Sequence, residues 1–271
     1  MTDGASWAPP GVDTRRASPA RVYDYWLGGS HHFQADRDAA RALIAVEPSA
    51  RDVARANRAF LARAVRFLAA EGIRQFLDIG SGIPTQGNVH EVARAAAPGA
   101  RVLYADIDPV AVAHSRAILD GDGSAAAIQG DLRDPEQILA SPEAARLLDT
   151  GQPVGLLLVA VLHFLTDADD PWRLVGRLRE LAAPGSYLVI SHATTEDTPA
   201  GRAAMVESAY NRTVAIGNTF RSRARIERFF DGFSMVEPGI VYLPDWRPDP
   251  AAAALGDRAR RWFLAGAGRK P

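Results

Sequence analysis

The stretch Phe76-Leu77-Asp78-Ile79-Gly80-Ser81-Gly82 joins an apolar run to an acid and two glycines that are one residue apart. Gly80 and Gly82 have no Cβ, so the backbone can turn tightly there and come close to a ligand. In open α/β sheets, ligands bind outside the carboxyl ends of the strands. The stretch therefore predicts a first strand over Gln75–Ile79 and a ligand-binding loop after it.

Downstream of this stretch, strand and helix patterns alternate. The predicted strands are Arg101–Asp106, Ala125–Gln129, Val154–Leu162 and Ser186–His192, and the predicted helices are Asn88–Ala97, Pro109–Leu119, a region ending near Asp149, and Pro171–Ala182. The run Val154–Leu162 is apolar throughout, as in strands that are buried on both faces. This alternation predicts an α/β fold with a Rossmann-like, doubly wound and mostly parallel sheet.

The segments before this sheet are predicted to be helical. Helices are expected over Ala20–Leu27 and Ala35–Val46, and a longer helix is expected to start at Ser49, with Asp52 as its capping-box partner, and to end at Gly72. We therefore expect a flexible tail over residues 1–17 and an N-terminal helical extension, or lid, over residues 18–74.

The last third of the chain departs from the alternation. A polar stretch covers Thr194–Gly217, a helix is predicted at about Arg223–Phe230, and the strand-like pieces Ser234–Glu237 and Ile240–Leu243 predict an antiparallel edge hairpin. The alanine-rich end of the chain predicts a terminal helix. Residues 75–249 form the predicted core and residues 250–271 a C-terminal helical tail.

Composition excludes several classes of function. The 271 residues include no cysteine, which excludes disulfides and thiolate zinc sites, and the net charge of −1 gives no bulk basic field for nucleic acid. No apolar run reaches the ~18 residues of a membrane span, and the N-terminus lacks a signal-peptide core. The adjacent His31 and His32 cannot both bind one metal comfortably, and no carboxylate completes a set. We expect a cytoplasmic protein without a metal site; the oligomeric state is not predicted.

Acidic residues stand at three consecutive strand ends. Asp78 precedes the glycine turn, where it suits a ligand with a protonated amino group. Asp106 ends the second strand, where an acid accepts ribose hydroxyls, whereas Asp108 more simply caps the next helix. Asp131 ends the third strand and suits an adenine amino group, with the backbone N–H of Leu132 beside it. Each acid alone can be a helix cap, but the series predicts a nucleoside site.

A dinucleotide is the less favoured ligand of that site. The third glycine of the dinucleotide fingerprint would fall at Thr85, and it is absent. Asp78 would also repel a pyrophosphate, which binds at helix N-termini. NAD and FAD are therefore disfavoured.

The order Asp-x-Gly-x-Gly, an acid after the second strand, Gly-Asp-Leu after the third and Val-Leu-His-Phe after the fourth resembles class I S-adenosylmethionine-dependent methyltransferases. The longer strings that carry a closer resemblance are Ala20–Gly29, Ala56–Phe60, Phe76–Glu91, Leu157–Phe164 and Tyr187–Thr194. They are similar to the S-adenosyl methyltransferase family once classed as a domain of unknown function, DUF574. The resemblance covers about residues 18–249. Pro84 replaces a glycine of the wider class, which leaves the path of the loop 83–87 open.

The resemblance implies the fold, S-adenosylmethionine as cofactor and S-adenosylhomocysteine as product. The residues expected to bind the cofactor are Asp78, Gly80, Ser81, Gly82, Gln86, Asp106, Ile107, Asp131, Leu132, Ala160, Tyr23 and Arg58. In this set, Arg58 would clamp the methionine carboxylate or an acidic acceptor, or else be solvated or salt-bridged. Tyr23 would face the ligand from a helix on which Val22, Tyr25 and Trp26 share another face, where core packing is expected for some of these three.

The resemblance does not identify the methyl acceptor. His163, after the fourth strand, is the candidate catalytic base, with a packing role as the alternative. The leading hypothesis is a methyltransferase acting on a small molecule. The alternative is a module that binds S-adenosylmethionine or S-adenosylhomocysteine without methyl transfer.

Overall fold

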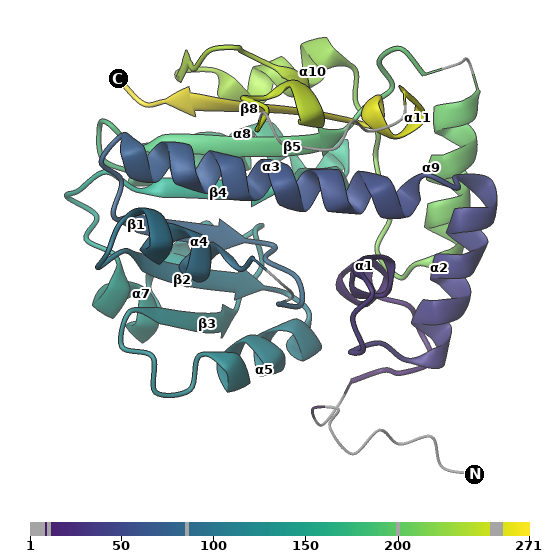
Figure 1. Cartoon of the computed structure of the whole chain (residues 1–271), viewed down its shortest axis with the longest axis horizontal. Helices are drawn as coiled ribbons and strands as arrows, with labels where there is room; N and C mark the ends of the chain where they lie inside the picture. Colours follow the sequence, from purple (N-terminus) through teal and green to yellow (C-terminus); the bar gives the residue numbers. More distant parts are fainter. Residues whose placement is uncertain (1–8, 10–11, 85–86, 199–200, 250–256) are drawn as a thin grey trace.

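The predicted apolar runs form one sheet in the computed structural model, which describes residues 9, 12–84, 87–198, 201–249 and 257–271. Its strands are β1 (Gln75–Ile79), β2 (Arg101–Asp106), β3 (Ala125–Gln129), β4 (Gly155–Val159), β5 (Tyr187–Ala193), β6 (Ser234–Met235), β7 (Val241–Tyr242) and β8 (Phe263–Arg269). The order is β3-β2-β1-β4-β5-β8-β6, and β7 also pairs with β8. Strands β1 to β5 are mutually parallel, as predicted, and β8 runs antiparallel to β5 (Figure 1).

Helices cover both faces of the sheet. The helices are α1 (Pro19–Leu27), α2 (Gln34–Val46), α3 (Ala50–Ala70), α4 (Val89–Ala96), α5 (Pro109–Ile118), α6 (Pro135–Leu139), α7 (Pro142–Leu147), α8 (Pro171–Leu181), α9 (Arg202–Thr213), α10 (Arg223–Glu227) and α11 (Asp257–Arg260). One apolar layer joins α3 and α4 to the sheet, and the other joins α6, α7, α8 and α10 to its opposite face. The Rossmann-like arrangement predicted from the sequence is confirmed.

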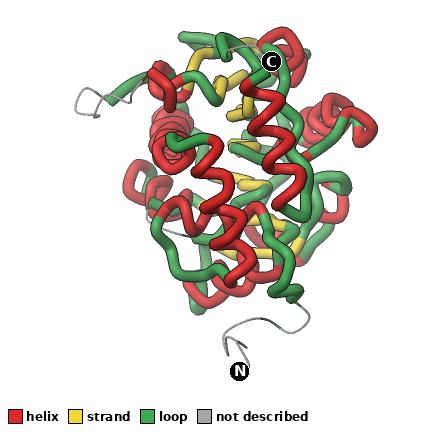
Figure 2. The backbone as a smooth tube through the Cα atoms, turned by 90° about the vertical axis from the view of Figure 1, so that its right-hand side faces the viewer, coloured by secondary structure: helices red, strands yellow, loops and turns green. Residues whose placement is uncertain are grey.

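A third group of helices stands off the carboxyl ends of the parallel strands. Helices α1, α2 and α9 lie beyond the tips of β1 and β2 in Figure 1, and Figure 2 shows helices in front of the strand ends. Val22 of α1, Leu43 of α2 and Tyr210 of α9 share one apolar cluster. The N-terminal extension therefore closes the side of the sheet where a ligand is expected.

Helix α1 begins and ends as its sequence predicts. Pro19 occupies the first helical turn, where its missing N–H costs nothing, and Gly28 ends the helix with a left-handed φ of 84°. Ser18 is the N-cap residue, but its side chain makes no capping hydrogen bond. For α3, the expected capping box between Ser49 and Asp52 is wrong: no side-chain cap forms there, and Asp52 pairs with Arg55 instead.

Of the terminal helix predicted within residues 250–271, residues 250–256 lie outside the described residues and Asp257–Arg260 is helical, but the prediction is wrong for Phe263–Arg269, which is the strand β8. This strand lies between β5 and β6, so it completes the core sheet and is not a tail. The expected hairpin of residues 234–243 is also wrong. Its two short strands, β6 and β7, both pair with β8 and not with each other. The antiparallel edge of the sheet is confirmed, with a different topology.

Two further boundaries differ from the sequence prediction. The polar stretch Thr194–Gly217 contains the helix α9, whose buried face carries Ala203, Ala209 and Tyr210. The fourth strand ends at Val159 and not at Leu162, because Ala160 takes a left-handed φ of 57° and turns the chain into a short 3₁₀ turn. Both differences bring side chains to the carboxyl edge of the sheet.

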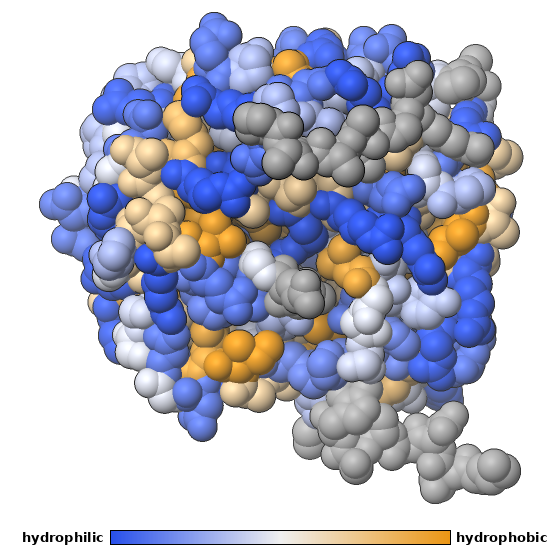
Figure 3. Space-filling view, in the orientation of Figure 1, coloured by the Kyte–Doolittle hydropathy of each residue, from blue (hydrophilic) through white to orange (hydrophobic). Residues whose placement is uncertain are grey.

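The face of the molecule drawn in Figure 3 is mostly hydrophilic, with small, separate hydrophobic patches. Within the described ranges, no helix has the length and apolar character needed to cross a bilayer.

Candidate functional site

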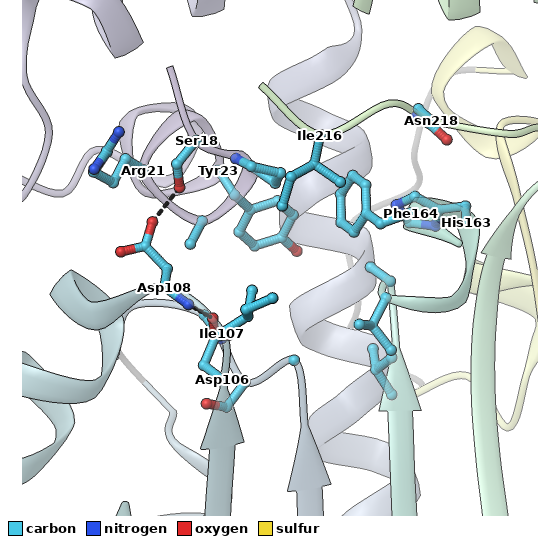
Figure 4. Close-up of a pocket in the computed structure, with 18 of the residues that line it drawn as sticks. Ser18, Arg21, Tyr23, Asp106, Ile107, Asp108, His163, Phe164, Ile216 and Asn218 are labelled. Carbon is cyan, nitrogen blue, oxygen red and sulfur yellow. Dashed lines mark hydrogen bonds between the residues drawn. The ribbon is translucent and has the colours of Figure 1, made fainter. Parts of the chain in front are cut away.

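A cavity of about 550 Å³ lies between the carboxyl edge of the sheet and the helices α1, α3 and α9. Figure 4 shows Asp106, Ile107 and Asp108 on one side of it, Tyr23 above, and His163, Phe164 and Asn218 on the other side. We call the side around Asp106 the cofactor half. The opposite side of the cavity, which we call the apolar chamber, is lined by Phe164, Val206, Tyr210, Ile216, Phe220, Trp262 and Phe263.

The glycine turn after β1 has the backbone that the sequence predicts. Gly80 and Gly82 have φ angles of 75° and 68°, which favour glycine. A Cβ on Gly80 would stand 2.4 Å from the Val161 side chain, whereas nothing lies within 4 Å of a Cβ position on Gly82. Gly80 is therefore required by packing against the segment after β4, and Gly82 leaves open space beside the cavity. Ser81 lines the cavity between them.

Asp106 organises the cofactor half. Its Oδ2 accepts a hydrogen bond of 2.7 Å from the Gly82 amide, and its Oδ1 accepts one of 2.8 Å from the Asp108 amide. Burial raises the pKa of Asp106 to about 6. Each carboxylate oxygen has two acceptor sites, so both oxygens can still accept hydroxyls from a ligand.

Asp108 has the structural role that the sequence predicts for it. Its Oδ1 caps α5 by accepting the Val110 amide at 2.8 Å. Its Oδ2 accepts the hydroxyl of Ser18, which comes from the start of α1. Asp108 therefore holds the N-terminal extension against the sheet.

Asp78 is a buried acid that faces the cavity without a protein hydrogen-bond donor. It is 3% exposed, and no donor among the described residues contacts its carboxyl group. Burial raises its pKa to about 7, against the opposing effect of Arg58. An uncompensated acid of this kind fits a ligand ammonium, which would favour the charged carboxylate. The amino group of S-adenosylmethionine has this chemistry, so the donor set fits that cofactor.

The residues expected around the adenine also line the cavity. Ile107 is 43% exposed although it is a large apolar side chain, which fits a surface that a ring would cover. Leu132 is buried beside it. Asp131 forms an ion pair of 3.0 Å with Arg133. Asp131 therefore lies where the sequence places it, but with one cationic partner already present.

Tyr23 and Ala160 are joined by a chain of hydrogen bonds through two side chains that the sequence prediction did not assign to the site. The Tyr23 hydroxyl donates to the Ala54 carbonyl at 2.9 Å and accepts from Asn57 at 3.1 Å. Oδ1 of Asn57 accepts the Ser191 hydroxyl at 2.6 Å, and Oγ of Ser191 accepts the Ala160 amide at 2.9 Å. This chain fixes α1 and α3 to the end of β4, where Ala160 holds its left-handed backbone.

Arg58 lines the cavity and donates to the Gly87 carbonyl at 3.2 Å. Its guanidinium lowers the pKa of Asp78, so it lies near the buried acid. The predicted site residue Gln86 lies outside the described residues.

His163 lines the cavity and is 3% exposed. Burial holds its pKa well below the ordinary value, and His192 and Arg221 act in the same direction. The neighbouring His192 has a structural role: its Nε2 accepts from Arg221 at 2.9 Å and its Nδ1 lies 2.7 Å from the Ala193 carbonyl. Arginine can only donate, so the proton of neutral His192 is on Nδ1. His192 is thus committed to the protein, whereas His163 faces the cavity.

The adjacent histidines His31 and His32 make contacts within the N-terminal loop. Asp24 accepts the His31 amide at 2.9 Å, and the His32 ring lies 3.1 Å from the Gly29 carbonyl. Among the described residues, no group of histidines and acids has the arrangement of a metal site.

Asn218 and Tyr210 are cavity residues that sequence reasoning missed. Tyr210 lies in the helix α9, which the sequence analysis did not predict, and Asn218 lies in the segment after that helix. The spacing of Ala203, Val206 and Tyr210 is helical, and it is the signal that would have revealed the helix. No local signal identifies Asn218, whose position depends on tertiary contacts.

The comparisons with known proteins agree with this geometry. Residues 5–271 match the family described as S-adenosyl methyltransferase. Among solved structures, a protein of Thermobifida fusca YX classed as a methyltransferase is 41% identical, with a TM-score of 0.91 over 97% of this chain and 98% of that one. A DUF574 family protein of Streptomyces avermitilis MA-4680 is 40% identical, with a TM-score of 0.91 over 96% and 99%. No curated protein matches the chain.

Family and fold together define the enzyme class as methyltransferase and the cofactor as S-adenosylmethionine. The match extends over almost the whole chain, including the N-terminal helices and β8. The chain therefore belongs to the S-adenosyl methyltransferase family.

Proposed function

We propose that the protein transfers a methyl group from S-adenosylmethionine to a small-molecule acceptor that binds in the apolar chamber. The observation that carries this proposal is the continuity of the cavity. Asp78 and Asp106 line one side of it, and Phe164 and Trp262 line the other, within a single volume of about 550 Å³. Pockets for small molecules commonly have volumes of roughly 300–1,000 Å³.

The chain's own residues bind and orient the two reactants. Asp78 receives the ammonium of the bound cofactor, and Asp106 receives its ribose hydroxyls while holding the glycine turn in place. Ile107 and Leu132 provide the apolar surface for the base, with Asp131 at its edge. When bound, the cofactor supplies an electrophilic methyl group. The helices α1, α3 and α9 enclose the site, which excludes water and holds the acceptor close to the methyl group.

The alternative of a binding module without methyl transfer is tested by turnover. Purified protein with S-adenosylmethionine and a mixture of neutral and charged aromatic small molecules should release S-adenosylhomocysteine, measured by mass spectrometry together with a product heavier by one methylene. Binding of S-adenosylhomocysteine in calorimetry, without methylation of any compound in a broad acceptor collection, would favour the binding module. Absence of heat with folded protein would contradict cofactor binding itself.

A further inference from the structure

Three polar side chains around the apolar chamber have no side-chain hydrogen-bond partner among the described residues. The atoms of these side chains that a ligand can reach, Nε2 of His163, Nδ2 of Asn218 and the Tyr210 hydroxyl, bond no described residue. Nδ1 of His163 and Oδ1 of Asn218 are enclosed by protein and are also unpaired. Each of these residues is more than nine-tenths buried. Buried polar groups are almost always hydrogen-bonded, so three unpaired groups in one cavity indicate a ligand with complementary polar atoms.

The protein holds two of these groups in fixed positions. The Asn211 side chain accepts the Asn218 amide at 2.6 Å and donates to the Asn218 carbonyl at 3.2 Å. The next residue, Thr219, donates its amide to the His163 carbonyl at 2.7 Å. Asn218 and His163 therefore lie on one wall of the cavity, as Figure 4 shows, and their backbones are tied together. Such anchoring is expected of groups that orient a ligand.

The wall of the chamber carries no charged side chain. Its lining residues come from the described segments 159–165, 206–220 and 262–263, and none of the cavity-lining members of these segments is charged. Glu47, which lines the cavity just after the end of α2, is paired with Arg202 at 2.7 Å. A charged acceptor would lose its hydration here without gaining a counter-ion, which is costly. The chamber therefore selects neutral acceptors.

The apolar part of the chamber is rich in aromatic rings. Phe164, Tyr210, Phe220, Trp262 and Phe263 all contribute to its lining. Aromatic side chains favour stacked or edge-on contacts with other rings. A flat ring system is the ligand shape that uses these surfaces best.

We propose that the acceptor is a neutral, planar aromatic compound with a hydroxyl group, which is methylated on that oxygen with His163 as the proton acceptor. This proposal rests on the function proposed above and names its substrate class. The acceptor oxygen forms a bond to the methyl carbon, and the carbon–sulfur bond breaks with its electron pair remaining on sulfur. The hydroxyl proton passes to Nε2 of His163, since Nδ1 is enclosed by protein. Asn218 and Tyr210 bind other oxygen substituents of the ring.

A weakly basic imidazole is adequate for this step. Burial keeps the pKa of His163 low, so the ring is neutral at physiological pH and its lone pair is available. As the new carbon–oxygen bond forms, the acceptor oxygen gains positive charge and its proton becomes strongly acidic. The position of the base therefore matters more for this step than its basicity does.

The first test is the binding of three matched probes to the protein saturated with S-adenosylhomocysteine. Calorimetry should show that 1-naphthol binds at least about tenfold more tightly than 1-naphthoate or 1-naphthylmethylammonium. Binding of S-adenosylhomocysteine itself is the internal control for the function proposed above. If it binds but 1-naphthol does not, or if a charged probe binds as well, the acceptor class is wrong and methyl transfer to another acceptor is unaffected.

The second test is turnover of 1-naphthol to its methyl ether. His163→Ala should lower kcat by about 100-fold or more, the usual contribution of a positioned base, with unchanged affinity for S-adenosylhomocysteine. Asn218→Ala should leave the KM for 1-naphthol, which has no second oxygen substituent, nearly unchanged, and should raise the KM for 1,5-dihydroxynaphthalene. His114→Ala, in a histidine outside the cavity, is the matched control and should behave as wild type. Failure of the wild-type protein to methylate 1-naphthol would overturn the proposed acceptor class, and a His163→Ala variant within threefold of wild type would overturn the role of His163.

Discussion

Asp78 shows how a single residue couples ligand binding to protonation. In the ligand-free protein it is buried without a hydrogen-bond donor, and its pKa is raised to about 7. Such a group is unfavourable for the folded state when it is charged, and it is retained where a ligand supplies the missing charge.

The pH dependence of cofactor affinity follows from this coupling. A cofactor ammonium binds the charged carboxylate, so Asp78 must lose its proton before binding when the pH is below about 7. The Kd for S-adenosylhomocysteine should therefore increase by up to about tenfold per pH unit as the pH falls from 7 to 6. Calorimetry at several pH values measures this change in the Kd. Asp78→Asn should bind more weakly at pH 8 and have a flatter profile; a wild-type profile in this variant would show that another group titrates.

Asp106 and Asp108 stand two residues apart, and the structure separates their roles. Asp106→Ala removes an acceptor for the ribose and releases the Gly82 amide, so cofactor binding should weaken by about 1–3 kcal/mol. Asp108→Ala removes the cap of α5 and should lower stability by about 1 kcal/mol. Calorimetry and thermal unfolding of both variants distinguish the two effects. A greater loss of binding in Asp108→Ala would reverse the assignment of the ribose acceptor.

At the scale of elements, the strands β1 to β3 were predicted with correct ends because each is a short apolar run followed by an acid or a glycine. Strand β8 was not predicted, because its sequence Phe-Leu-Ala-Gly-Ala-Gly-Arg is rich in small residues with low strand propensity. The structure gives the reason for these small residues. A Cβ on Gly268 would stand 2.8 Å from the Phe233 side chain, so close packing of distant segments requires glycine there.

As with the strands, the sequence predicted those site residues that local patterns reveal and missed those that depend on tertiary packing. The acids Asp78, Asp106 and Asp131 follow strands that local patterns reveal, so their common edge could be inferred from the chain order. Asn218 could not be inferred, because it reaches the cavity through the packing of α9 against α2. Local sequence patterns do not contain contacts of this kind.

The segment Ser18–Phe33 is predicted to act as a lid over the cofactor. Its residues Ser18, Arg21 and Tyr23 line the cavity, and Ser18 bonds Asp108 across it. Hydrogen exchange with saturating S-adenosylhomocysteine should therefore show greater protection over Tyr23–Phe33 than without ligand. Protection of Gly80–Gly82 is the positive control. If only that control responds, the segment braces the protein from outside and is not a lid.

At the scale of the whole molecule, the two ends of the described chain have different structural roles. The N-terminal helices enclose the site, whereas β8 completes the sheet that carries it (Figure 1). The antiparallel strand inserted between β5 and β6 buries Leu264, Ala265 and Ala267 in both apolar layers. The C-terminus is thus part of the core, which a helical tail would not be.

Removal of residues 263–271 should therefore prevent folding. It deletes β8, exposes the edge of β5 and leaves β6 and β7 without a partner strand. An unpaired, apolar edge of this kind favours aggregation. Circular dichroism and sedimentation of the shortened protein should show an aggregated or unfolded chain, while deletion of the exposed Pro271 alone should change little. A soluble, cooperatively unfolding protein without β8 would contradict its structural role.

Two of the five tryptophans, Trp26 and Trp262, lie on the lining of the cavity, on α1 and just before β8 respectively. The indole emission spectrum depends on the polarity and the neighbours of the ring, so each ring responds to a molecule that binds beside it in the space between the N-terminal helices and the sheet. The tryptophan fluorescence of the protein therefore reports whether the cavity is occupied. Quenching or a spectral shift of its natural fluorescence allows collections of unlabelled compounds to be screened for the acceptor without a turnover assay, and Trp26→Phe and Trp262→Phe would tell which end of the cavity each compound occupies.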